Sequence, residues 1–386
     1  MARRLISFLG AGKDYDELLH LRPDTSKEIC ETDMVQEAIV RGHPEIDEVF
    51  VLVTPKAREE NWDSLLTVLP GGLETVEALD IPSGFSQDDQ WAIFEQLRAA
   101  SEEREEVLLD ITHSFRSIPL IAVAAALYLK EMDGTDVRIL YGALQEETVQ
   151  LVELTPFMRL VEMAFAARSF LRHGDLGPLA ENLDALKELE GGESLEDVDV
   201  WIARMARALN LLRLPELRRY SLETRRKLMN ARLTPPPAED LLNRIQDEIG
   251  DFSEGILGHS LEQLQYYRRR NQWVEALLCS RELVLTLLCD RFGLEPTNWN
   301  HRKPIRDALN DQRSEITVAG QTVTLSKNVR EWYEEMGKLR NQVAHNSITS
   351  ELPYHDSPKD FQDTVQKKLK EFSEYVEDYI AGAELQ

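Results

Sequence analysis

The sequence predicts a doubly wound α/β domain followed by all-α segments. Strand-like and helix-like patterns alternate up to about residue 155, and strand patterns largely disappear after Pro156. A further boundary is expected at Pro235-Pro236-Pro237, which interrupts helix propagation. The chain of 386 residues also exceeds the roughly 250–300 residues that one core supports. We therefore expect a Rossmann-like domain over residues 1–155, a helical connector over 156–235 and a helical domain over 236–386.

Strands are expected where short apolar runs are bounded by turn residues. Glu48–Val53 and Glu106–Ile111 are almost continuously apolar, which is typical of parallel strands covered on both faces. The other expected strands are Arg4–Leu9, Glu74–Leu79, Val137–Tyr141 and Thr148–Leu154, and the helices between them are Asp33–Arg41, Glu59–Val68, Gln87–Ala99 and Ile118–Lys130. In such a sheet, ligands bind beyond the carboxyl ends of the strands, where the strand order reverses.

The rest of the chain is predicted to be helical. Apolar residues recur at helical spacing over Met158–His173, Leu176–Leu189, Leu195–Leu212, Leu214–Asn230, Asp240–Glu248, Leu261–Arg269, Trp273–Phe292, Lys303–Asp311, Lys327–His345 and Lys359–Ala381. Thr317–Leu325 is the exception, and we expect a β-hairpin or an extended loop there.

The charge balance limits the partners of this protein. The formal net charge is −25, and the first 150 residues hold 13 basic against 30 acidic residues. A field this negative disfavours non-specific binding along duplex nucleic acid. It leaves room for a small basic pocket that grips one or a few phosphates, so any nucleic-acid contact should be local.

Cysteine content and hydropathy exclude other classes. The three cysteines, Cys30, Cys279 and Cys289, lack pair spacing, which argues against a disulfide framework, a zinc site or an iron–sulfur cluster. The N-terminal apolar run ends before Lys13, too early for a signal peptide. No stretch approaches the roughly 18 apolar residues of a membrane span. We therefore expect a soluble, cytoplasmic protein with no membrane partner, no metal and no cofactor.

The strongest chemical signal lies near the end of the expected helix Lys327–His345. Arg340, Asn341 and His345 fall within one face of that helix, because Asn341 and His345 are four residues apart. Histidine can take the proton of an RNA 2′-hydroxyl or protonate the leaving 5′-oxygen, since its pKa lies near neutrality. Arginine offers a permanently charged fork to the phosphate, and asparagine can orient the histidine or bind the phosphate. This scheme predicts a metal-independent ribonuclease site.

A bland explanation of the same residues stays open. An arginine and a histidine five apart occur by chance in many helices. A histidine late in a helix can simply complement the negative end of the helix dipole.

A second signal lies at two strand ends of the α/β domain. The turn after the first strand reads Gly10-Ala11-Gly12-Lys13, where glycines permit close backbone approach and the lysine can meet a phosphate. The strand Glu106–Ile111 is followed by Thr112, His113, Ser114 and Arg116, and here a helix N-terminus can face an anion. Together these turns predict a pocket for a nucleotide-like ligand. Ordinary capping between strand and helix is the alternative.

Both signals resemble one family. Asp110-Ile111-Thr112-His113-Ser114-Phe115-Arg116 resembles the D-x-T-H-G-F-R signature of CRISPR-associated proteins of the DxTHG type. Arg340-Asn341 with Ala344-His345 is similar to the R-x4-H signature of their HEPN domain. Further likenesses are Ser7-Phe8-Leu9-Gly10, Thr32–Ala38, Leu52–Ala57 and Asn61-Trp62. The resemblance covers about the first 150 and the last 150 residues, and residues 156–235 carry no motif of the family.

The resemblance implies a fold, an activity and a set of site residues. It implies a CARF sensor domain for a cyclic oligoadenylate of type III CRISPR defence, with cyclic tetra-adenylate as first candidate, and a dimeric HEPN endoribonuclease that cuts single-stranded RNA without metal. The activator pocket would include Gly10, Ala11, Gly12, Lys13, Thr112, His113, Ser114 and Arg116, with Thr32 and Gln36 as neighbours, and the nuclease would be Arg340, Asn341 and His345. Ser114 replaces the glycine of the family signature, which puts the pocket geometry and ring size in question.

Two other functions remain open from the sequence. One is a cyclic-nucleotide-responsive regulator with a silent helical domain. The other is a sensor that also degrades its own activator, since Lys13, Thr112 and His113 suit binding or slow cleavage equally.

Overall fold

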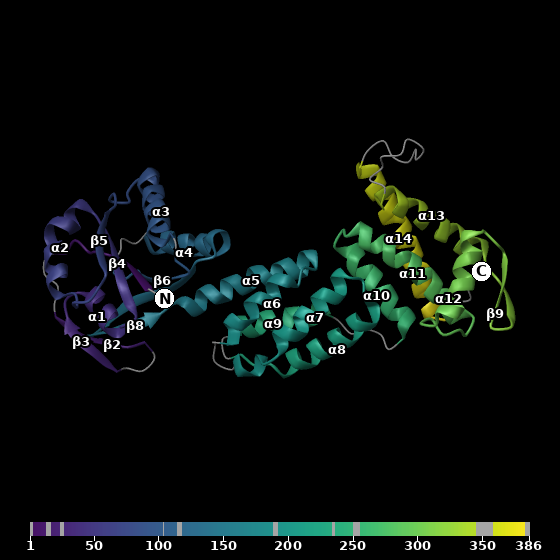
Figure 1. Cartoon of the computed structure of the whole chain (residues 1–386), viewed down its shortest axis with the longest axis horizontal. Helices are drawn as coiled ribbons and strands as arrows, with labels where there is room; N and C mark the ends of the chain where they lie inside the picture. Colours follow the sequence, from purple (N-terminus) through teal and green to yellow (C-terminus); the bar gives the residue numbers. More distant parts are fainter. Residues whose placement is uncertain are drawn as a thin grey trace. The chain divides into compact units, whose positions relative to one another are not determined.

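The computed structural model describes residues 3–12, 17–23, 27–102, 104–113, 118–187, 192–233, 236–249, 255–344 and 358–382 (Figure 1). The chain divides into two compact units, Met1–Glu162 and Met163–Gln386. The first unit is built on a β-sheet, and the second is helical apart from one hairpin. The predicted order, an α/β domain followed by a helical region, is confirmed. The finer boundaries at residues 155 and 235 stay predictions.

The first unit contains one sheet of eight described strands. They are β1 (Arg3–Phe8), β2 (Leu18–Leu21), β3 (Glu28–Thr32), β4 (Ile46–Val53), β5 (Thr75–Asp80), β6 (Glu106–Asp110), β7 (Asp136–Gln145) and β8 (Thr148–Glu153), in the order β3-β2-β8-β7-β6-β1-β4-β5. β1 pairs in parallel with both β4 and β6, whereas β7 and β8 are antiparallel. The order of the parallel strands therefore reverses between β1 and β6.

Helices cover both faces of this sheet. α1 (Val35–Gly42) and α2 (Pro55–Val68) pack on one face, and α3 (Gln87–Ser101) and α4 (Ile118–Tyr128) pack on the other (Figure 1). Successive side chains of β1 point to opposite faces of the sheet. The fully buried Leu5 packs in the core on the face of α1 and α2, and the buried Ile6 packs in the core on the face of α3 and α4. The strand is thus apolar on both sides, as the continuous apolar runs predicted.

The sequence did not predict β2 and β3. Leu18–Leu21 has four residues, too few for a periodic pattern. β3, at the edge of the sheet, has the exposed glutamates Glu28 and Glu31 and no strict alternation of buried and exposed side chains. Their antiparallel pairing, together with the parallel pairing of β2 with β8, adds two strands to those that the sequence predicted. The hairpin also buries His20, whose Nδ1 lies 2.9 Å from the Leu18 carbonyl oxygen.

The second unit is a helical assembly. α5 (Thr155–His173) runs from the first unit into the second and is followed by α6 (Gly177–Lys187), α7 (Val198–Asn210), α8 (Leu214–Asn230), α9 (Pro236–Ile249), α10 (Ile256–Arg269), α11 (Trp273–Arg291), α12 (Trp299–Asn310), α13 (Lys327–Ala344) and α14 (Pro358–Ile380). α11 is central to the C-terminal part, where it contacts α10, α12, α13 and α14. Every residue from Leu283 to Cys289 is buried, which explains its apolar sequence.

The sequence left Thr317–Leu325 open between a hairpin and a loop, and the structure shows a hairpin. β9 (Glu315–Val318) and β10 (Gln321–Thr324) pair antiparallel. Ala319 and Gly320 connect them with φ values of 48° and 80°, the left-handed conformation that two-residue hairpin turns require. Across the described residues, no helix has the length and apolar character needed to cross a membrane.

Candidate functional sites

A cavity opens where the strand order reverses. It measures about 460 Å³, and we call it the switch-point cavity; its walls are Phe8, Leu9, Gly10, Ala11, Gly12, Leu52, Thr54, Lys56, Ile81, Thr112, His113 and Ile118. The two turns that the sequence singled out, one after β1 and one after β6, therefore meet in one cavity at the carboxyl ends of the strands. This is the location that the α/β architecture predicts for a ligand.

The glycine turn after β1 is fixed by Asn61 of α2. The side-chain amide of Asn61 is buried, and its Nδ2 donates to the carbonyl oxygens of Gly10 and Gly12, both at 2.8 Å. One side chain therefore satisfies two carbonyl groups of the turn. The turn presents its backbone to the cavity in a defined shape.

The turn after β6 is fixed by Asp110, which is fully buried. Its Oδ1 accepts hydrogen bonds from the Thr112 backbone nitrogen at 2.9 Å and the Thr112 hydroxyl at 2.5 Å, and its Oδ2 accepts one from Ser7 at 2.6 Å. The Thr112 hydroxyl also accepts a hydrogen bond from the Gly142 nitrogen at 2.7 Å. This hydroxyl thus holds the turn in place, which is a positioning role.

Gly142 of β7 permits this close approach. A Cβ at Gly142 would lie 2.9 Å from Thr112 Cγ2, closer than real Cβ contacts come, and 3.1 Å from Val149 Cγ1, which is a tight contact. A larger residue at this strand position would therefore displace Thr112 from its place in the turn. This role of Gly142 was not predictable from a local sequence pattern, because Thr112 is 30 residues away.

The other predicted pocket residues are placed differently. Gln36 is buried beneath β1 and donates to the Ser7 hydroxyl and the Phe8 carbonyl oxygen at 3.1 and 3.0 Å. Thr32 is buried and donates to Glu37 at 2.6 Å. Neither lines the switch-point cavity, so both act as supports behind it. Lys13, Ser114 and Arg116 lie outside the described residues.

Lys56 and Thr54 line the cavity although the sequence did not place them in the site. Thr54 caps α2 by accepting a hydrogen bond from the Ala57 nitrogen at 3.2 Å, and Pro55 begins the helix. Lys56 is the only lysine or arginine among the described residues of the cavity wall. The available signal was a Thr-Pro pair directly after a buried strand, which marks a helix N-terminus at a strand end.

His113 enters the cavity as a neutral imidazole. Burial lowers its pKa from the ordinary value of 6.5, and the nearby Asp110 carboxylate only partly opposes this. A neutral ring can donate one hydrogen bond and accept another, which suits a nucleobase or a ribose hydroxyl.

Of the three predicted nuclease residues, Arg340 and Asn341 lie on α13. Arg340 and Asn341 are in the last turn of this helix; His345 directly follows its last residue and lies outside the described residues. Asn341 is exposed. Arg340 lines a second cavity of about 380 Å³, the arginine cavity, whose described walls are Leu278, Arg281 and Glu282 of α11, Arg306 and Asn310 of α12, and Tyr333 and Arg340 of α13.

Three arginines from three helices, Arg281, Arg306 and Arg340, line the arginine cavity. The Arg281 guanidinium lies over the Tyr333 ring, with its Cζ 4.3 Å from the ring centroid. The Nε atoms of Arg281 and Arg340 are buried and lack a hydrogen-bond partner among the residues that the structure describes. The sequence predicted only Arg340 as a site residue. Arg281 lies in a largely apolar helix and Arg306 in another helix, and neither belongs to a motif that would have indicated a site.

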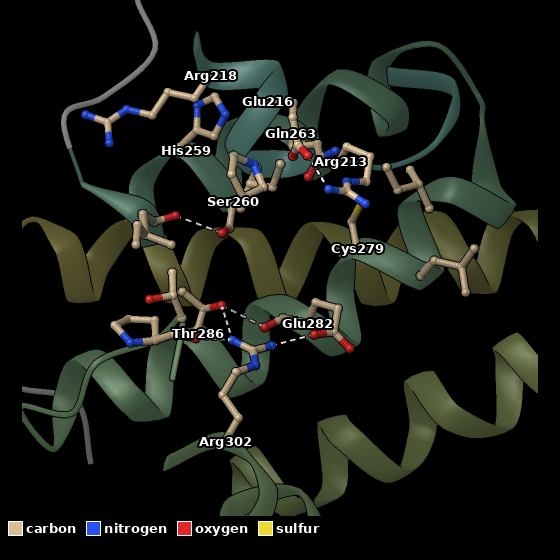
Figure 2. Close-up of a pocket in the computed structure, with 17 residues that line it drawn as sticks. Arg213, Glu216, Arg218, His259, Ser260, Gln263, Cys279, Glu282, Thr286 and Arg302 are labelled. Atoms are coloured by element: carbon tan, nitrogen blue, oxygen red, sulfur yellow. Dashed lines mark hydrogen bonds and ion pairs between the residues drawn. The ribbon is translucent and has the colours of Figure 1, made fainter. Parts of the chain in front are cut away.

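A third cavity, of about 730 Å³, adjoins the arginine cavity, and we call it the large cavity. Figure 2 shows its polar lining, in which Arg302 bonds Glu282 and the Thr286 hydroxyl, the latter at 3.2 Å. Leu278 and Glu282 line both cavities. Cys279 also lines the large cavity, but burial raises the pKa of its thiol to about 12, so it is protonated and unreactive.

Residues suited to metal binding are scattered. Within the described ranges, no group of three or more histidine, cysteine, aspartate or glutamate side chains is placed to hold a metal ion.

The chain combines an α/β unit, with a cavity at the switch point of its sheet, and a helical unit with an arginine-lined cavity. No family model matches the chain. It is 21% identical over 325 residues to a CRISPR-associated protein of Methanocaldococcus jannaschii, an alignment that covers 78% of this chain and 48% of that protein. The chain thus spans about half the length of the curated relative that it matches.

Proposed function

We propose that this chain is a CRISPR-associated RNA endonuclease that is activated by a cyclic oligoadenylate. The main support is the placement of Arg340. This residue is the arginine of an R-N-x3-H motif, and it lines a cavity together with two further arginines. The similarity to a CRISPR-associated protein supports the cellular context. In this proposal the first unit is a CARF sensor, and the C-terminal part of the second unit is a HEPN nuclease.

The proposed chemistry uses the 2′-hydroxyl of the RNA as nucleophile. His345 takes the proton of the 2′-hydroxyl, and the 2′-oxygen attacks the adjacent phosphorus. The bond between this phosphorus and the 5′-oxygen of the next nucleotide breaks, and the 5′-oxygen receives a proton. The products are a 2′,3′-cyclic phosphate and a 5′-hydroxyl. Arg340 neutralises charge on the phosphate as it builds up, and Asn341 orients the histidine or the phosphate.

The proposed activator site is the switch-point cavity. Pockets of roughly 300–1,000 Å³ enclose one drug-sized ligand, so about 460 Å³ suits about one nucleotide of a ring. A cyclic tetra-adenylate is larger than this and would need the cavities of two chains. A two-fold homodimer, with one cavity from each chain, matches the symmetry of such a ring.

One assay tests the proposed function. A fluorescent single-stranded RNA is incubated with the protein and each cyclic oligoadenylate in turn, with excess EDTA present. Cleavage with one ring size is expected, at a rate that the chelator does not change, and a 2′-deoxy substitution at the cut site should block it. Loss of activity in EDTA that magnesium or manganese restores would contradict the proposed chemistry. Activator binding without cleavage would favour a regulator.

The activator cavity leads to a separate prediction. Lys56→Ala and Lys13→Ala should each raise the activator concentration for half-maximal cleavage by about tenfold, the cost of one lost charged contact of about 1.4 kcal/mol. The maximal rate should change little, because a weaker ligand still shifts the same equilibrium when more is added.

The control for this titration is Lys130→Ala. Lys130 pairs with Asp136 at 3.1 Å, at the amino end of β7 and thus at the opposite edge of the sheet. Its activator titration should match that of the wild type. If Lys56→Ala and Lys13→Ala also titrate like the wild type, the activator binds elsewhere.

A further inference from the structure

Arg281 and Arg306 line the same cavity as Arg340, but they are not part of the sequence motif that contains Arg340. Each comes from its own helix, α11 and α12, and neither belongs to a local sequence pattern. From their contacts we infer that Arg281 and Arg306 bind a phosphate of the RNA next to the one on which Arg340 acts. This inference rests on the proposed function, and it adds a substrate-positioning site to it.

The first argument is the charge balance inside the arginine cavity. Arg281 and Arg340 make no ion pair with the residues that the structure describes, and both have a buried Nε. Glu282 also lines the cavity, but it is paired with Arg302. Partly buried guanidinium groups without an anion are costly, and a bound anion removes that cost. In a chain with a formal net charge of −25, such a cluster is a local exception.

The second argument is that Arg281 is held in place before any ligand arrives. Its guanidinium lies over the Tyr333 ring, and Gly337, one turn further along α13, lies close beside it. A Cβ at Gly337 would lie 3.6 Å from Arg281 Cζ, in van der Waals contact. Tyr333, Gly337 and Arg340 follow one another on the same face of α13. The helix that carries the nuclease motif therefore also positions Arg281.

Arg306 is available to an anion for a different reason. Its guanidinium lies over Trp299, 4.7 Å from the ring centroid, and its ion pair with Asp307 measures 3.1 Å. Both partners of this pair are more than one-third exposed, so the pair contributes little free energy. A phosphate can replace the carboxylate at small cost, and the aromatic ring keeps the guanidinium in position.

The geometry favours a phosphodiester of RNA over an isolated anion. Planar guanidinium forks match phosphate oxygens, and a polynucleotide offers a second phosphate one nucleotide away from the first. Leu278 and Glu282 line both the arginine cavity and the large cavity, so the two cavities are neighbours. The large cavity, whose lining Figure 2 shows, offers space for a nucleoside joined to the held phosphate. A strand that passes Arg340 would then be held on one side by Arg281 and Arg306.

The test measures binding and cleavage separately. Binding of a fluorescent, uncleavable 2′-O-methyl RNA is followed by anisotropy at several salt concentrations for the wild type, Arg281→Gln and Arg306→Gln. Each substitution should weaken binding about tenfold at low salt and reduce the slope of log affinity against log salt by roughly 0.7, the value for one lost phosphate contact with a single strand. With cleavable RNA, KM should rise, while kcat stays within about threefold, as expected for lost uniform binding.

Matched variants separate a phosphate contact from a structural effect. Arg291→Gln, an exposed position on α11, and Arg313→Gln, which pairs with Asp311, should leave both affinity and salt slope unchanged. Arg281→Lys should keep most of the salt slope, because the charge remains. If Arg281→Gln does not fold, Arg306→Gln still tests the inference, because Arg306 lies on a different helix.

The outcomes that overturn the inference differ from those that overturn the proposed function. An unchanged salt slope in both Gln variants would exclude phosphate contacts, even if the wild type cleaves RNA. A loss of dimerisation in sedimentation experiments, with RNA affinity intact, would instead assign Arg281 to a contact with a second chain. A wild type that never cleaves RNA but binds it through Arg281 and Arg306 would refute the nuclease and leave the phosphate site standing.

Discussion

Replacement of His345 by alanine is expected to lower activator-dependent RNA cleavage by about 10³-fold or more. General acid–base catalysis by a positioned side chain contributes about 10²–10⁴-fold. In the proposed mechanism, His345 is the residue that transfers the proton. The loss should appear in kcat, because the proton moves only in the transition state. Arg340→Ala should be similarly severe, since the phosphate loses the donor that meets its developing charge.

Three measurements distinguish this result from misfolding. Activator affinity should stay at the wild-type value, because the switch-point cavity belongs to the first unit. The thermal unfolding midpoint should also be retained. His173→Ala, an exposed histidine at the end of α5, serves as the control and should cleave at the wild-type rate. Full activity of purified His345→Ala would remove His345 from the mechanism.

Arg340→Lys refines the role of the arginine. A lysine keeps the positive charge but presents a single rotating donor group in place of a planar fork. If charge alone stabilises the phosphate, Arg340→Lys should retain most of the activity. If two parallel hydrogen bonds are required, the variant should resemble Arg340→Ala.

The location of the switch-point cavity was predictable because it follows from few rules. Apolar runs identify parallel strands, carboxyl ends of parallel strands share one edge, and ligands bind where the order reverses. The turns after β1 and β6 therefore had to meet, as they do at Gly10 and Thr112. The supporting contacts were not predictable, because Asn61 and Gly142 act on partners 30 to 51 residues away.

The arginine cavity shows where local patterns stop being informative. Arg340 stands in a recognisable motif, whereas Arg281 is one of two arginines in a largely apolar helix, and Arg306 follows a proline within α12. Only the packing of α11, α12 and α13 brings these three arginines to the wall of one cavity. The short strands β2 and β3 were missed for a related reason, since their pairing across the sheet, and not their own pattern, defines them.

The proposed nuclease should be a two-fold dimer with one shared active site. The chain carries one set of Arg340, Asn341 and His345. Cleavage needs a base on one side of the phosphate and an acid on the other, which is difficult for one imidazole. Residues near a two-fold axis meet their own copies, so two sets facing each other would supply two histidines and two arginines around one strand. In this proposal, movement of the two sensor domains about the same two-fold axis changes the distance between the two sets of nuclease residues.

Mixed dimers test this arrangement directly. Wild-type chains are combined with an excess of differently tagged His345→Ala chains, and the heterodimer is purified through both tags. A shared site predicts that the heterodimer has about a tenth or less of the wild-type rate, because either the base or the acid is missing from the single site. A heterodimer of wild type and His173→Ala should keep full activity. Half of the wild-type activity in the first heterodimer, or a fully active monomer in light scattering, would show that each chain cuts RNA alone.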